Sequence, residues 1–447
     1  MTNVIVELSK YVILTLMLVY TFYCFFLVRR QNAQDNDGPL TKQILLIFFM
    51  ESVAFAVLFL KGRQPEVILF YAEVMGYFAA VQILYRFLYP KASFLLVNNM
   101  CMLMGIGFLM LERLDKASAQ KQLLIAAGAS LVCLVVPVLI RKMRFLNRLT
   151  YFYAAIGIVL LGAVLAVGNT VYGAKLSIMG VQPSEVVKIT FVFFMAACLY
   201  RKISVRKVII ATITAGLHVI ILVLSRDLGS ALIFFVTYLI MIYVAARKPI
   251  LLVAGLLGGS VASAGAYFLF GHVRQRVTAW KDPMAVYENE GYQIVQSLFA
   301  IGTGGWFGMG LCQGSPEKIP VVKSDFIFSA ICEELGGIFG ICLILVCMNF
   351  FLMILNISLR IKNPFFKLIA LGLGTEYAIQ VILTVGGVTK FIPLTGVTLP
   401  LVSYGGTSVV STIVMLSIVQ GLYILREDED EEIEKIRRRA YFKERGF

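Results

Sequence analysis

The sequence GYQIVQSLFAIGTGGWFGMGLCQGSPEKIPVVKSDFIFSAICEELGGIFG, residues 291–340, mixes glycine, amide, lysine and carboxylate side chains between long apolar runs. If residues 292–301 form a helix, Gln293 and Gln296 share one face because they lie three positions apart. The opposite face is then apolar, with Ile294, Val295, Leu298 and Phe299. This pattern predicts a short amphipathic helix that lies in the membrane interface or dips into it.

Asp325 stands where the next long apolar run, Phe326–Leu359, begins. Between the amphipathic segment and Asp325 the backbone can turn sharply at several glycines, at positions 304, 305, 308 and 310. Aspartate is a favoured N-cap residue, and its charge is stabilised by the helix dipole. The alternative is a catalytic carboxylate at the boundary of water and lipid. The position of Asp325 alone leaves both interpretations open.

Composition sets the class of protein. The chain has 447 residues, of which 59% are hydrophobic and 15% charged, whereas a soluble domain usually has about 25% charged residues. An all-α polytopic membrane protein is therefore expected, since a β-barrel would show short alternating segments. The net charge of +14 arises from basic residues in short loops, which indicates membrane orientation and no nucleic-acid partner. The eight cysteines include no CxxC pair, so neither a disulfide framework nor a zinc site is expected.

The apolar runs predict about thirteen spans, each near the ~20 residues that cross a bilayer. The first three are Tyr11–Val28, Gln43–Leu60 and Val67–Leu88. Lysine and arginine gather in alternate loops, which belong in the cytoplasm. This alternation predicts an outside N-terminus, outside loops 271–324 and 386–406, and a charged cytoplasmic tail, residues 427–447.

Polar groups also mark the predicted outer ends of other spans. Glu185 and Lys188 lie three residues apart at a helix start and can face each other. Ionisable groups at membrane depth are often functional, while a self-neutralising pair would stabilise the helix start, and both interpretations can hold. Asp227 can serve a site or cap the next helix. Irregular backbone around Ser403 is tolerated only where protein buries it or water reaches it.

Several motifs fall in a family's order along the chain: GVQPSEVVKI at 180–189, DLGSA at 227–231, RVTAWKDP at 276–283, GYQIVQSLFAIGTGGWFGMGL at 291–311, SDFIFSAICEELGGIFG at 324–340 and IPLTGVTLPLVSYGGTS at 392–408. With them the chain resembles the SEDS family (shape, elongation, division and sporulation), the FtsW/RodA/SpoVE group of peptidoglycan glycosyltransferases. The resemblance implies a ten-helix core, residues 93–426, preceded by about three extra transmembrane helices in residues 1–92.

The resemblance also implies an activity and a partner. Such proteins polymerise lipid II into glycan strands outside the bacterial cytoplasmic membrane, with release of undecaprenyl diphosphate, in cell division, elongation (cell shape) or sporulation. They work with a class B penicillin-binding protein, a transpeptidase. The family's catalytic acid matches Asp325, its membrane-face pair matches Glu185 and Lys188, and the serine of its SYGG segment matches Ser403.

The chemistry of glycan polymerisation can be stated from the residues. A carboxylate can take the proton of the attacking hydroxyl, and Asp325 is the candidate base. Positive side chains can stabilise the departing phosphates, and so can a divalent cation such as Mg²⁺ or Mn²⁺; no metal ligands are assigned. The candidate substrate contacts besides Glu185 and Lys188 are Asp227, Arg274, Arg276, Gln293, Gln296, Lys318, Lys323 and Ser403.

Two other functions compete with an enzyme. A lipid II flippase would also contain apolar helices and buried charges, although it should carry polar features on both membrane sides. A non-catalytic scaffold of the cell-wall machinery would not need Asp325. The chain also departs from the family at Arg226, Thr384 and Lys390, which puts the substrate contacts of those loops in doubt.

Overall fold

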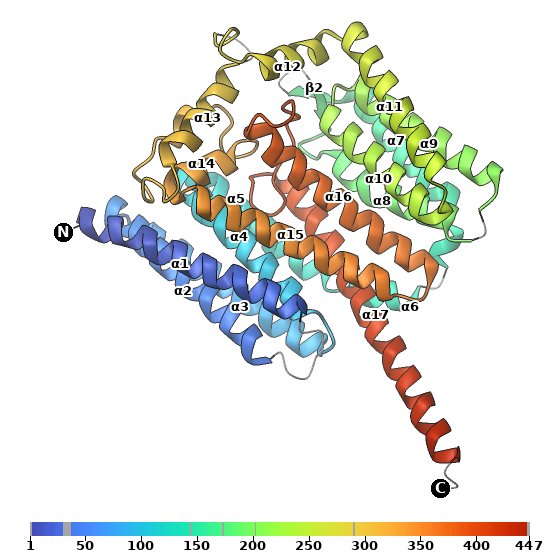
Figure 1. The fold of residues 1–447 in the computed structure, drawn as a ribbon. Coiled ribbons are helices and arrows are strands. Elements are labelled where there is room, and N and C mark those ends of the chain that lie inside the picture. The colour runs from blue at the N-terminus through green and yellow to red at the C-terminus, as the bar shows by residue number, and fades with distance from the viewer. Residues whose placement is uncertain are drawn as a thin grey trace.

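The protein is described by a computed structural model over residues 2–29, 37–143, 145–171, 174–201, 203–288 and 291–444 (Figure 1). In these ranges twelve helical segments are long and apolar enough to cross a membrane, which confirms the polytopic all-α prediction. They are α1 (Thr2–Arg29), α2 (Asp37–Gly62), α3 (Glu66–Leu88), α4 (Phe94–Leu114), α5 with α6 (Lys116–Cys133 and Val136–Lys142), α7 (Thr150–Val167), α9 (Val205–Leu224), α10 (Leu228–Ala246), α11 (Pro249–Leu269), α15 (Gly337–Arg360), α16 (Pro364–Val388) and α17 (Gly406–Glu444).

The remaining elements are shorter. Helix α8 (Pro183–Leu199) has 17 residues, most of them buried, and occupies the position of the other predicted span. The others are η2 (Leu146–Arg148), the antiparallel hairpin of β1 (Asn169–Val171) and β2 (Ala174–Ser177), α12 (Gly271–Lys281), α13 (Tyr292–Gly304), η3 (Pro316–Lys318) and α14 (Ile327–Leu335). Among the lysine and arginine residues that gather in alternate loops between the spans, Arg30, Arg144 and Lys202 lie outside the described residues.

The span predicted as Phe326–Leu359 is wrong as one helix, because the chain breaks at Gly336 into α14 and α15. Gly336 has φ 95°, a left-handed conformation that favours glycine. A Cβ there would lie 2.5 Å from the backbone nitrogen of Gly308. The glycine-rich turn after α13 is bonded to this break, with Gly337 N donating to Gly305 O at 2.8 Å. The two short helices α13 and α14 therefore form one packed unit.

The centre of the bundle is α4, whose residues are almost all buried, whereas α11 lies at the periphery with no buried residue. Figure 1 shows the start of α1 near α13 and α14, with the end of α17 at the opposite end of the molecule. Near that opposite end, Asp428 on α17 pairs with Lys91 at 2.8 Å and with Arg141 at 2.6 Å. The charged C-terminal helix is thus tied to basic residues of that end.

The helices α1–α3 are joined to the rest of the bundle by a buried polar network. Asn99 on α4 is at its centre: its Oδ1 accepts from Tyr20 OH at 2.8 Å, and its Nδ2 donates to Asn349 on α15 at 2.9 Å. A second branch joins Gln82 to Asn98. Polar groups in an apolar bundle bond across helices because lipid offers them no partner. This network therefore fixes how the N-terminal helices sit on α4 and α15.

We expect Tyr20→Phe to lower the free energy of unfolding by about 1 kcal/mol, because it removes one buried hydrogen bond while keeping the ring. Denaturant unfolding in detergent measures this change. Tyr151→Phe is the matched control, since Tyr151 is exposed on α7 and its replacement should have little effect. Equal stability of the two variants would contradict the proposed role of the network.

Candidate active site

Asp325 lies in the loop just before α14, at the end of the molecule that carries α12 and α13. The N-cap of α14 is Phe326, without a side-chain cap bond, so the capping interpretation of Asp325 is wrong. Its carboxylate instead lies against the turn at Gly396, where a Cβ would come 3.5 Å from Asp325 Oδ2. Gly396 has φ 72°, so glycine also suits this turn conformationally.

Arg276 on α12 holds the same turn from another side. Its Nη1 donates to the carbonyl oxygens of Thr395 at 2.9 Å and Leu394 at 3.2 Å. Burial lowers the pKa of Arg276, while the carboxylates of Asp227 and Asp325 act in the opposite direction. An arginine has five N–H donors in a planar fork, so Arg276 can both fix the loop and present hydrogen atoms to an anion.

Burial raises the pKa of the Asp325 carboxyl above its ordinary value, and this effect is opposed by a hydrogen bond from Ser324 and by the charge of Arg276. A raised pKa moves a carboxylate toward the pH at which it can accept and return a proton. Desolvation combined with a specific charge partner is the pattern expected at functional sites. The surroundings of Asp325 therefore suit a general base.

Asp227 is the N-cap of α10, as one of its two predicted interpretations stated. Its Oδ1 accepts from Ser230 N at 3.0 Å, and its Oδ2 accepts from Ser184 Oγ at 3.2 Å. Burial raises the pKa of Asp227 as well. Gly229, in the next turn, packs against Thr395 O, where its Cβ would be 3.1 Å away. Asp227 thus lies close to the loop that Arg276 holds.

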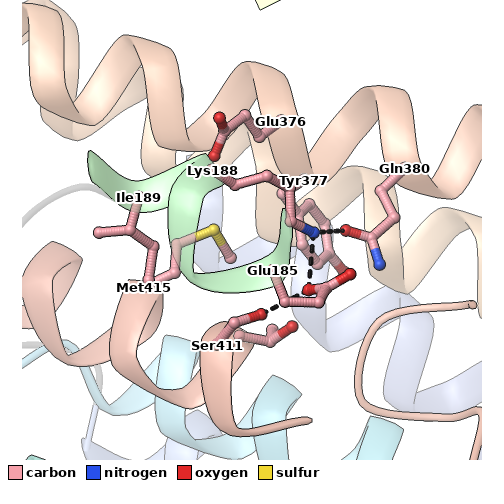
Figure 2. Close-up of a pocket in the computed structure, with 9 residues that line it drawn as sticks. Glu185, Lys188, Ile189, Glu376, Tyr377, Gln380, Ser411 and Met415 are labelled. Atoms are coloured by element: carbon pink, nitrogen blue, oxygen red, sulfur yellow. Dashed lines mark hydrogen bonds and ion pairs between the residues drawn. The ribbon is translucent and has the colours of Figure 1, made fainter. Parts of the chain in front are cut away.

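A second polar centre lies between α8, α16 and α17. Glu185 and Lys188 form an ion pair of 2.8 Å, and both side chains are 7% exposed. Figure 2 shows Lys188 Nζ also directed at Gln380, at 2.8 Å, and Ser411 Oγ directed at Glu185, at 2.7 Å. The self-neutralising pair is therefore present, and Ser411 and Gln380 extend it into a network around a small cavity.

Gln380 links this cavity to the loop near Asp325. Its Nε2 donates to Thr398 O at 3.0 Å. One turn further along α16, Thr384 Oγ1 donates to Val397 O at 2.9 Å. The departure at Thr384 thus supplies a bond to the same loop, while the departures at Arg226 and Lys390 adopt left-handed φ values of 64° and 60°. The structure gives no reason why arginine and lysine stand at these two turns.

Two further predicted substrate contacts, Lys323 and Ser403, also bond within the protein. Lys323 pairs with Asp115 and Ser118 at the start of α5, and its hydrogen bond lowers the pKa of Asp115 to about 2. Ser403 is 2% exposed, and its Oγ accepts from Leu399 N at 3.0 Å. The Lys323 side chain thus pairs with the start of α5, whereas the Ser403 side chain closes a turn within residues 399–403.

The other predicted contacts lie on α12, α13 and η3. Arg274 is exposed on α12, and its Nη2 reaches Phe268 O at 3.5 Å. Gln293 is partly buried, while Gln296 Nε2 donates to Tyr287 OH at 3.1 Å. Lys318 and Gln296 line one cavity, apart from Asp325. The predicted helix is confirmed as α13, although its apolar face is not uniform: Ile294 and Val295 are buried, whereas Phe299 is 55% exposed.

Sequence reasoning missed Glu376 and Gln380. Both lie on α16, four positions apart and therefore on one face, and both line the Glu185–Lys188 cavity (Figure 2). Glu376 is 3% exposed, and its Oε1 has no hydrogen-bond partner among the described residues. The available signal was an ionisable residue inside an apolar span.

The described residues do not form a ready site for a divalent cation. No group of three or more His, Cys, Asp or Glu side chains that could hold a metal ion occurs among them. Arg276 also interacts with both Asp227 and Asp325, and its positive charge disfavours a second cation beside them. No step of the reaction proposed below is therefore assigned to Mg²⁺ or Mn²⁺.

The fold and the site together define the class of protein: a polytopic helical membrane protein with a carboxylate–arginine site at one end of its helix bundle. The FTSW_RODA_SPOVE family, described as cell cycle protein, matches residues 87–427. The chain belongs to this FtsW/RodA/SpoVE (SEDS) family. The match begins close to the start of α4, and most of α1–α3 lies outside it.

Named relatives and solved structures agree with this assignment. The peptidoglycan glycosyltransferase RodA of Mycobacterium tuberculosis is 33% identical over 421 residues, which cover 84% of this chain and 89% of the relative. Stage V sporulation protein E of Bacillus subtilis is 33% identical over 251 residues, or 53% of this chain and 66% of that protein.

A structure of a peptidoglycan synthase complex that coordinates polymerization and crosslinking has a chain similar to this one, with TM-score 0.64 and 24% identity, over 75% of this chain and 98% of that chain. The crystal structure of Thermus thermophilus rod shape determining protein RodA matches with TM-score 0.56 and 22% identity, over 74% and 96% of the two chains. At these identities the structures support the fold.

Proposed function

We propose that this chain is a peptidoglycan glycosyltransferase that polymerises lipid II into glycan strands at the outer face of the bacterial cytoplasmic membrane and releases undecaprenyl diphosphate. The observation that carries the proposal is the Asp325 carboxylate, partly desolvated, beside Arg276 and the Gly396 turn. Similarity over most of the chain to relatives named peptidoglycan glycosyltransferases supports the same activity.

In the proposed reaction, Asp325 accepts the proton of the acceptor sugar's hydroxyl as its oxygen attacks the donor's anomeric carbon. A new C–O bond forms while the bond from that carbon to the lipid diphosphate breaks, and the diphosphate leaves with the electron pair. The positive charge of Arg276 acts on the Asp325 carboxyl and lowers its pKa. Its remaining N–H groups would stabilise the negative charge that develops on the phosphates.

We propose three functional parts for the chain. Residues 93–426 form the catalytic core, with the loop 271–324 outside the cell, and residues 427–447 form a cytoplasmic tail. Residues 1–92 form an extension for docking or assembly, whose first helix also touches the outer loop: Lys10 Nζ donates to Gly308 O at 3.4 Å. A class B penicillin-binding protein is the proposed crosslinking partner, as suggested by the synthase complex among the similar structures.

Membrane topology provides an independent test. Residue 1 and the loop 271–324 are proposed to be outside and residue 447 inside. In intact cells carrying a variant without native cysteines, a membrane-impermeant thiol reagent should label single cysteines at Thr2 and at Lys281, which is exposed at the end of α12, but not at Phe447. After permeabilisation all three should react. Labelling at Phe447 in intact cells would reverse the proposed orientation.

A further inference from the structure

A cavity apart from both polar centres lies between α13 and the segment that leads to α14. It has a volume of about 230 Å³. Its polar lining includes Gln296 and Thr303 from α13, Ser315 and Lys318 near η3, and Glu333 from the last turns of α14; its apolar lining includes Phe299. A concave space with a few convergent polar groups among apolar side chains is typical of a ligand site.

Glu333 lines this cavity and has one carboxylate oxygen without a hydrogen-bond partner among the described residues. The residue is 6% exposed, and its Oε1 accepts from Ser315 N at 2.9 Å. Its Oε2 has no hydrogen-bond partner among the described residues. A carboxylate offers about four acceptor positions, and a buried acceptor without a donor is energetically costly. Glu333 Oε2 therefore fits a donor supplied by a ligand, such as a hydroxyl or amide N–H.

The surroundings hold Glu333 in place. Its backbone oxygen accepts from Met309 N at 2.9 Å. Gly314 lies so close that a Cβ there would come 3.0 Å from the carboxyl carbon of Glu333. The neighbouring Glu334 differs, because it pairs with Arg113 at 3.2 Å and does not line this cavity. The adjacent carboxylates therefore have different surroundings: among the described residues Glu334 pairs with a cation and Glu333 does not.

The other residues that line the cavity complement a ligand that carries both hydrogen-bond donors and acceptors. Lys318 is exposed at the cavity and carries three N–H donors. The side-chain nitrogen of Gln296 donates to Tyr287, which leaves its carbonyl oxygen as an acceptor. Phe299 supplies an exposed aromatic ring beside them. Hydroxyls and an N-acetyl group on a sugar ring present this combination of donors, acceptors and apolar faces.

We propose that this cavity is a subsite for an N-acetylated amino-sugar ring of the glycan substrate, with Glu333 Oε2 accepting from a hydroxyl or amide N–H and Lys318 donating to a carbonyl or carboxylate oxygen. The inference rests on the proposed glycosyltransferase function. Glu333 lies six residues, roughly 9 Å along the helix axis, beyond Ile327 at the start of α14. It is therefore a binding residue removed from the reacting atoms at Asp325.

The test is steady-state polymerisation of lipid II by the purified full chain with its penicillin-binding partner. Glu333→Gln keeps the size of the side chain and an oxygen for Ser315 N, but can place an amide N–H where the ligand needs an acceptor. We expect KM for lipid II to rise about 10- to 100-fold with kcat retained, the range for losing a hydrogen bond to a charged group. A change in KM without kcat indicates binding lost equally from ground and transition states.

Glu317→Gln is the matched control, because Glu317 is an exposed carboxylate in the same loop and does not line the cavity. Its KM should equal that of the wild type. If Glu333→Gln fails to fold, Lys318→Gln provides the test, because the exposed Lys318 side chain can be replaced with little effect on folding. A raised KM of Lys318→Gln supports the subsite, and an unchanged KM overturns it. An unchanged KM in folded Glu333→Gln, or a loss confined to kcat, also overturns the subsite.

Failure of the subsite and failure of the proposed function give different results. An inactive wild type rejects the glycosyltransferase proposal, and the subsite with it. An active wild type whose variants have normal KM rejects the subsite alone. A soluble N-acetylglucosamine disaccharide provides a second measurement: it should inhibit the wild type competitively and inhibit Glu333→Gln more weakly. Equal inhibition of both would contradict the proposed contact.

Discussion

Asp325→Asn is expected to reduce polymerisation of lipid II by at least ~10²-fold, the usual contribution of a positioned general base. The asparagine side chain keeps the size of the aspartate but cannot accept the proton of the acceptor hydroxyl. The α14 N-cap is Phe326, so loss of a helix cap does not accompany the change. Purified Asp325→Asn should remain folded and still bind its penicillin-binding partner.

The pH dependence of the wild type provides a second readout. Asp325 is active when deprotonated, and burial raises its pKa above the ordinary aspartate value of 3.8. Activity should therefore fall as the pH drops through a value above 3.8. Because the charge of Arg276 lowers this pKa, Arg276→Gln should move the acid limb of kcat/KM to higher pH, in addition to any loss of rate.

Asp282→Asn is the matched control for Asp325→Asn. Asp282 lies at the end of α12, is exposed, and accepts from Ala285 N at 3.2 Å, a turn contact that asparagine can also make. The Asp282→Asn variant should polymerise lipid II at the wild-type rate. An Asp325→Asn variant with close to wild-type activity would reject the catalytic assignment. In detergent, lipid II does not have to be flipped across a membrane. A wild type that is inactive in detergent, with its penicillin-binding partner present, would therefore favour the flippase or scaffold alternatives.

Lys188→Ala is expected to lower the free energy of unfolding by about 3–5 kcal/mol, the effect of removing one partner of a buried ion pair. The change leaves Glu185 without its 2.8 Å partner and removes a donor to Gln380. It also leaves Glu376 as a second carboxylate in the same cavity. Expression and thermal stability in detergent should both fall.

The double variant Glu185→Gln, Lys188→Met should recover part of this stability, since no uncompensated charge then remains from the pair. Lys121→Ala is the control, because Lys121 is exposed on α5 and its removal should change stability by no more than about 0.5 kcal/mol. If the Lys188 and double variants are as stable as the parent but inactive, the pair serves the substrate and a structural role is contradicted.

The number and type of most elements follow from local sequence. An apolar run of about 20 residues has to satisfy its backbone within lipid, and a helix does this without distant partners. Twelve spans, the short α8 and the amphipathic α13 were therefore predictable. The motif at Asp325 also pointed to the family before any contact was known. The break at Gly336 was missed because hydropathy does not record backbone conformation.

The partners of the polar side chains were decided by the tertiary structure alone. Lys323 carries the positive charge expected of a phosphate contact, yet it pairs with Asp115, 208 positions away. Arg276 reaches the Thr395 carbonyl across 119 positions. Glu376 lies alone in an apolar run and Glu333 lies beside another carboxylate, but in neither case does the sequence reveal which groups surround the charge. Local pattern determines secondary structure, whereas the role of a charge depends on which distant groups the packed helices bring within hydrogen-bond distance.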